Sequence, residues 1–73
     1  MHIQAIITAI ENHSVLIIAT AEQNERRETL NKRIYEVRGM LELARRLSGH
    51  NQLVRFLKGH IEWLNSCSEI LPS

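Results

Sequence analysis

The stretch that decides the fold is residues 3 to 21, IQAIITAIENHSVLIIATA. Twelve of its residues are apolar, residues 15–19 form an unbroken apolar run, and Glu11 is its one charged residue. In a chain of 73 residues the remainder is short for covering such a segment. The stretch therefore predicts a helix that must be covered, either by its own chain or by a partner.

The length of the chain leaves room for one small domain. A domain of this size buries roughly 60% of its unfolded surface, so its core is marginal and oligomerisation, a metal or disulfides often add stability. Cys67 is the only cysteine in the sequence. A single cysteine excludes an internal disulfide and is typical of a reducing compartment. We therefore expect a cytoplasmic protein that gains stability from another protein chain.

The charge balance argues against strong general attraction to nucleic acid. Nine Lys and Arg residues face eight acidic residues, all of them Glu, which gives a net charge of +1. So small a net charge attracts polyphosphates only weakly. The absence of Asp also removes a common metal ligand and catalytic residue.

Two targeting interpretations were weighed for the apolar stretch. Residues 15–21 resemble the apolar region of a secretory signal, and Ala19-Thr20-Ala21 has the form of a cleavage site. However, residues 1–14 contain no Lys or Arg, and Glu11, Asn12 and His13 interrupt the roughly 20 apolar residues that a bilayer requires. We therefore expect neither a signal peptide nor a membrane span.

Isoleucines recur in this stretch at the alternating four- and three-residue steps of one helix face. Asn12, His13 and Ser14 are weak helix formers, and Ser14 has a side chain suited to an N-cap. We predict a helix over about 2–21 that either breaks at 12–14 or runs straight through. Its apolar face is the predicted protein-contact surface and consists of Ile3, Ile6, Ile7, Ile10, Ile17 and Ile18.

A second stripe with the same spacing predicts a helix over about 28–48. Gly39 lies inside this helix, where we expect it to allow the close approach of another backbone. Gly49 is placed to end the helix as its C′ residue. The stripe consists of Leu30, Ile34, Val37, Leu41 and Ala44.

A third stripe predicts a helix over about 51–71, with His50 or Asn51 as its N-cap. At about 30 Å this helix can cover only the helix before it, so residues 3–21 are left outside that hairpin. Polar residues 22–29 are expected to form a bend, a stutter or a solvated stretch. The third stripe consists of Leu53, Leu57, His60, Leu64, Cys67 and Leu71.

Together the stripes predict a single all-α domain over residues 1–73, with an antiparallel helical hairpin preceded by an apolar N-terminal helix. That helix either folds back to complete a three-helix bundle or pairs with another chain in a dimeric helical bundle. The three aromatic residues are most simply core and interface residues, and Trp63, if exposed, is a candidate binding anchor. They are Tyr35, Phe56 and Trp63.

In layout, residues 28–71 resemble the small helical-hairpin co-chaperones that hold needle subunits of bacterial type III secretion before export. Small phage-encoded regulators that bind host proteins are similar in size and helicity. The resemblance is one of architecture and rests on no diagnostic motif. It implies a co-chaperone, inhibitor or adaptor that acts by binding a protein.

The residues that carry chemistry do not form a recognisable site. The histidines at 2, 13, 50 and 60 lack the three- or four-residue spacing of a helical metal site. His60 and Cys67 are two helical turns apart, about 10 Å, which is too far for activation of the thiol. No glycine-rich phosphate loop or serine-nucleophile motif appears. We predict no enzymatic activity, no metal and no cofactor.

Nucleic-acid binding is the main alternative function. A glycine-containing turn precedes four residues of types that read base edges, which suggests an element like a helix-turn-helix around 41–60. Those four residues are Asn51, Gln52, Arg55 and Lys58. Arg26, Arg27, Lys32 and Arg33 are candidate phosphate contacts. In the competing interpretation Asn51 caps a helix and the basic residues are solvated.

The function that the sequence favours is non-enzymatic binding of a protein through an apolar helix face. The partner is either a different protein or a second copy of the chain, since isologous dimers are the commonest symmetric assemblies.

Overall fold

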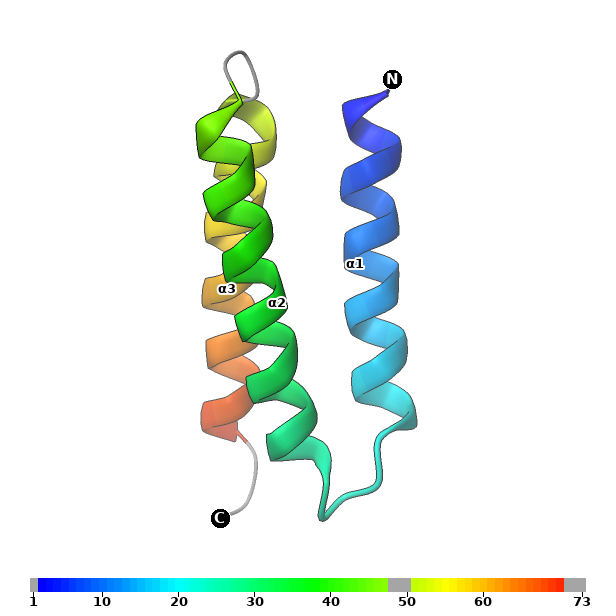
Figure 1. Ribbon diagram of the computed structural model, residues 1–73. Helices are drawn as coiled ribbons and strands as arrows, with labels where there is room; N and C mark the ends of the chain where they lie inside the picture. The colour runs from blue at the N-terminus through cyan, green and yellow to red at the C-terminus, as the bar shows by residue number, and fades with distance from the viewer. Residues whose placement is uncertain (1, 48–50, 71–73) are drawn as a thin grey trace.

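The computed structural model describes residues 2–47 and 51–70 (Figure 1). Within these ranges the chain forms three helices and no strand: α1 (Ile3–Thr20), α2 (Arg26–Arg46) and α3 (Asn51–Ile70). The helices alternate in direction along an elongated bundle of 40 × 18 × 15 Å. The predicted all-α fold is confirmed.

The first helix, α1, runs without interruption through residues 12–14. The break that the sequence left open does not occur, and Ser14 is not an N-cap. It lies in the middle of α1 with its side chain fully buried. Weak helix propensity costs only a few tenths of a kcal/mol per residue, and tertiary contacts routinely outweigh it.

A short turn joins α1 to α2. Ala21 is extended, and the backbone N–H of Glu25 donates to the carbonyl of Glu22 at 2.9 Å. The second helix begins at Arg26, earlier than the predicted residue 28, because the polar residues after the turn are compatible with a solvated first helical turn. The predicted roles of Gly49 and His50, and the predicted end of the third helix at 71, lie outside the described residues.

The core lies between α2 and α3, which run antiparallel and side by side (Figure 1). The second and third predicted stripes face each other along this contact. Burial of each large apolar side chain contributes about 1.5–3 kcal/mol. Four of them are fully buried, namely Leu30, Val37, Leu57 and Leu64.

The N-terminal helix folds back and lies against both helices of the hairpin. It buries little of itself, because only Ile7 and Ser14 of its 18 residues are buried. Ile10 and Ile18 pack against the edge of the hairpin core. By length and composition alone α1 could also cross a membrane, a property that core helices of other proteins and signal sequences share.

Tyr35 is not a core residue, because it lies on the surface with 79% of its side chain exposed, and an interface role for it stays a prediction. It follows the buried Ile34, and one residue step turns the helix by about 100°, away from the core. Phe56 is partly buried against the core, whereas Trp63 is 41% exposed. Trp63 thus meets the condition of exposure, and its role as a binding anchor stays a prediction.

Two helical glycines are exposed, Gly39 in α2 and Gly59 in α3. A β-carbon built at either position would meet no atom within 4 Å. The prediction that Gly39 allows close approach of another backbone is therefore wrong for the part of the chain that the structure describes.

Both glycines should be sites of stabilisation. Gly39→Ala and Gly59→Ala are each expected to raise the free energy of unfolding by about 0.5–1 kcal/mol, because alanine loses less backbone entropy in a helix. Urea denaturation followed by circular dichroism measures the change. The reverse substitution at an exposed helical alanine, Ala9→Gly, should lower stability by a similar amount. A loss of stability in Gly39→Ala would instead reveal a hidden contact at that position.

Candidate functional site

A buried polar cluster, formed by Ser14, Arg33 and His60, joins α1 to both helices of the hairpin. The Arg33 side chain donates from Nε to Ser14 Oγ at 2.8 Å and from Nη2 to the carbonyl of Ile10 at 3.1 Å. Ser14 Oγ also lies 2.7 Å from His60 Nε2. All three side chains are buried. One hydroxyl thus bridges α2 and α3 from α1.

The donors and acceptors of the cluster favour a neutral His60. Arginine only donates, so Ser14 Oγ accepts from Arg33 and its own hydrogen remains free for His60 Nε2. In that arrangement the imidazole is neutral and carries its proton on Nδ1. Burial and then the positive charge of Arg33 lower the pKa of His60, while the Glu11 carboxylate opposes them. The neutral ring is therefore the form that this site favours at neutral pH.

The buried guanidinium of Arg33 depends on a small set of oxygens. Besides Ser14 and Ile10, Glu36 Oε1 lies 3.5 Å from Arg33 Nη1, and Glu36 is partly exposed. A buried charge is costly unless its hydrogen bonds are satisfied. Displacement of α1 along the hairpin would therefore leave the buried guanidinium of Arg33 without its acceptors on α1. We infer that the cluster sets the position of α1.

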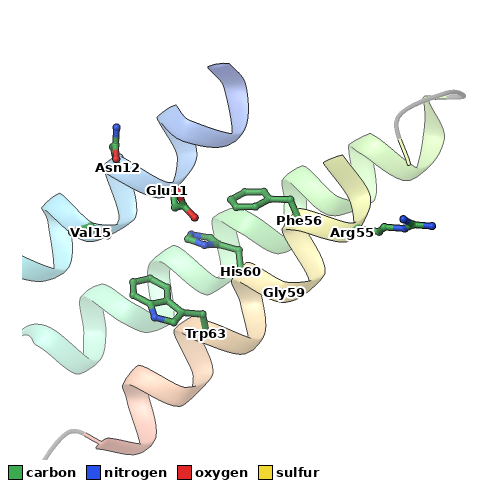
Figure 2. Close-up of a pocket in the computed structure, with 8 residues that line it drawn as sticks. All are labelled: Glu11, Asn12, Val15, Arg55, Phe56, Gly59, His60 and Trp63. Carbon is green, nitrogen blue, oxygen red and sulfur yellow. The ribbon is translucent and has the colours of Figure 1, made fainter. Parts of the chain in front are cut away.

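A groove of about 560 Å³ runs between α1 and α3 beside the cluster (Figure 2). Its α3 wall is a row of three stacked rings. The ring centroids of Phe56 and His60 are 5.1 Å apart with planes at 22°, and those of His60 and Trp63 are 5.4 Å apart at 24°. The volume falls in the range of small-ligand sites.

Two charged side chains line this groove and they have opposite signs. Figure 2 shows Glu11 extending from α1 toward the ring row and Arg55 extending away from it. Arg33 adds a positive charge behind His60. The groove therefore does not select a ligand by charge.

A second groove, of about 340 Å³, is lined by apolar residue types. It lies where all three helices meet, at the end of the bundle that holds the start of α1 (Figure 1). Leu43 and Leu47 border it with more than half of each side chain exposed. Its lining consists of Ile6, Ile10, Met40, Leu43, Ala44, Leu47, Leu53 and Leu57.

The structure turns the predicted isoleucine contact surface toward the chain's own hairpin. Ile7 is buried, and the other members of the surface are partly buried: Ile3, Ile6, Ile10, Ile17 and Ile18. The large apolar side chains that α1 leaves exposed are Val15 and Leu16. The third helix of the bundle is therefore supplied by α1 itself. Ile6 and Ile10 also line the second groove, and the use of the isoleucine surface by a partner stays a prediction.

The predicted nucleic-acid contacts Asn51, Gln52, Arg55 and Lys58 are all exposed on the first half of α3. However, α2 and α3 lie alongside each other, whereas the helices of a helix-turn-helix meet at about 90–120°. Residues 41–46 and 51–60 of this element therefore belong to two antiparallel helices that pack side by side. Arg33, a predicted phosphate contact, is buried and unable to reach a phosphate.

Sequence reasoning missed the polar cluster, although a signal for it exists. Ser14 and His60 occupy slots of the first and third apolar stripes, and Arg33 lies three residues after Leu30 on the inward side of the second. Each inward-facing helix surface thus contains one polar residue. Polar residues in apolar slots of three different helices predict a shared network, because buried polar groups are hydrogen-bonded.

The Ser14–His60 pair has the spacing of a nucleophile and its base, but Ser14 has no exposed surface that a substrate could reach. Within residues 2–47 and 51–70, no three His, Cys or Glu side chains gather as metal ligands.

Comparisons with protein-family models, with curated proteins and with solved structures find no match to this chain. Fold and site define a small three-helix bundle whose N-terminal helix is held by one buried polar cluster.

Proposed function

We propose that this protein is a non-enzymatic protein-binding module that packs its exposed apolar helix surface against a helix of a partner. The observation that carries the proposal is the exposure of large apolar side chains on the described helices. Each of five such side chains is at least 41% exposed, namely Val15, Leu16, Leu43, Leu47 and Trp63. Exposed apolar surface that is gathered beside a groove is typical of protein-binding sites.

The chemistry of the exposed surface supports the same function. Large apolar side chains that are 41–61% exposed border both grooves, and α1 contributes to each groove. Grooves between parallel or antiparallel helices suit the apolar face of another helix. Leucine and tryptophan side chains at such a rim provide the apolar area that association buries. The bordering residues are Val15, Leu43, Leu47 and Trp63.

The first partner to test is a second copy of the chain. Light scattering on a sizing column, across a dilution series, is expected to show a mass that rises with concentration. Leu47→Glu should shift self-association to at least tenfold higher concentration, because it places a charge in an apolar interface. Tyr35→Glu is the matched control, since Tyr35 is exposed but lines neither groove. A monomer at every concentration, equal in all variants, would contradict self-association as the use of this surface.

The exposed basic residues at the start of α3 support nucleic-acid binding as a second candidate. A DNA duplex at low salt is the probe, and Arg55→Ala with Lys58→Ala is the variant. Binding that falls steeply with salt and disappears in the variant would favour this candidate. We expect no such binding, because the net charge of +1 gives little attraction to the phosphate backbone.

A further inference from the structure

The hydrogen bonds that attach α1 to the hairpin are concentrated in one place. In the part of the chain that the structure describes, the hydrogen bonds from α1 to α2 and α3 all belong to the polar cluster. The apolar part of this contact is small, with Ile7 as the one buried apolar side chain of α1. By contrast, α2 and α3 share an extended apolar core. A change in the polar cluster is therefore expected to weaken the attachment of α1 more than the contact between α2 and α3.

Protonation of His60 costs the cluster the hydrogen bond that the Ser14 hydroxyl donates and brings two cations close together. A proton on Nε2 removes the acceptor of the Ser14 hydroxyl hydrogen. It also places a positive charge 2.7 Å from Ser14 Oγ, which is itself 2.8 Å from Arg33 Nε. The two cationic groups are then at most about 5.5 Å apart, and both side chains are buried, so solvent screens them less than it would at the surface.

The charged groups around His60 come from two helices. Arg33 approaches it from α2, with Glu36 on the far side of the guanidinium as a partly exposed partner. Glu11 approaches from α1 and favours the charged ring. Its neighbours on α3, Phe56 and Trp63, are uncharged rings stacked on both sides. The carboxylate of Glu11 is exposed to solvent and so only partly offsets the buried cation.

From this geometry we propose that α1 is an acid-released arm: protonation of His60 detaches α1 from the hairpin and uncovers the apolar face beneath it. Release frees Ile7, Ile10 and Ile18 of α1 together with the hairpin residues that they cover. Where these faces serve the proposed protein-binding function, mild acid increases the surface available to the partner. That last consequence rests on the proposed function, whereas release itself does not.

The pH range over which α1 is released follows from the direction in which the pKa of His60 is shifted. The pKa of His60 in the docked state lies below its ordinary value of about 6.5, because burial and Arg33 disfavour the charged ring. The released state binds the proton more readily than the docked state. Docking is therefore fully stabilised above about pH 6.5 and is progressively lost as the pH falls below that value.

Hydrogen exchange on the isolated protein, at concentrations where it is monomeric, tests the proposal. Between pH 7.5 and 5.5, after correction for the intrinsic pH dependence of exchange, the protection of α1 amides should fall severalfold relative to those of α2 and α3, up to the limit of about tenfold that one proton with an ordinary pKa of about 6.5 sets over this range. His60→Gln should remove this pH dependence, because glutamine can accept from Ser14 and does not titrate. His13→Gln, at an exposed histidine of α1, is the matched control and should behave as the wild type.

Two results would overturn the proposal: α1 protection that does not change with pH, or the same pH dependence in His60→Gln. If His60→Gln fails to dock α1 at either pH, a nuclear magnetic resonance titration of the wild-type rings decides. The midpoint of α1 release must then coincide with the titration of His60 and not with that of His13. Because no partner takes part, this outcome is independent of whether the surface binds a protein.

Discussion

Replacement of Leu57 by alanine is expected to lower the free energy of unfolding by about 2–5 kcal/mol, the usual cost of a leucine truncated in a packed core. Leu57 is fully buried between α2 and α3 and belongs to the core cluster of the hairpin. A chain of 73 residues has a total stability of about 4–11 kcal/mol. The substitution is therefore expected to remove a large share of the stability. Urea denaturation followed by far-ultraviolet circular dichroism measures this loss.

The matched control is Leu16→Ala on the surface of α1, where the leucine is 60% exposed and lines neither groove. The same atoms are removed, but the change in stability should stay within about 0.5 kcal/mol. Equal losses in the two variants would mean that the contact between α2 and α3 is not a packed core. A loss confined to Leu57→Ala supports the hairpin as the stable unit of the fold.

Replacement of Ser14 by alanine is expected to cost about 2–3 kcal/mol, although it improves the helix propensity of the position by a few tenths. The methyl group leaves Arg33 Nε and His60 Nε2 without their shared partner in a buried interface. An unsatisfied buried donor carries the full desolvation penalty, and the penalty is larger for a charged group. The two effects have opposite signs, so the sign of the measured change identifies the one that dominates.

Thr8→Ala is the control for helix propensity, because Thr8 is exposed on the same helix. It should raise stability by a few tenths of a kcal/mol. The double variant Ser14→Ala/Arg33→Met should cost less than the sum of its single changes, since removal of both partners leaves no stranded charge. Stabilisation by Ser14→Ala, or strict additivity in the double variant, would show that the cluster does not hold α1.

The helices and the hairpin were predictable because their causes are local. Apolar residues at steps of three and four specify which face of each helix is buried. Stripes of matching length on consecutive helices then favour an antiparallel pair. The start of α2 was missed by two residues, between 26 and 28, because the polar residues at its first turn give no periodic signal.

The candidate site was not predictable in the same way. Ser14 as an N-cap and Arg33 as a phosphate contact were each reasonable from the surrounding residues. Arg33 meets Ser14 across 19 residues of sequence, and His60 meets it across 46. Whether a polar residue is buried depends on a partner at that distance, which local sequence does not specify.

The sequence by itself determined three amphipathic or apolar helices and the pairing of the second with the third, since helical periodicity and chain length permit few other arrangements. The tertiary structure alone decided that α1 stays continuous, folds back and presents Ser14 to both hairpin helices. The physical reason is that desolvation of Arg33 and His60 is offset only when all three side chains meet. That condition is a property of the assembled bundle and of no single helix.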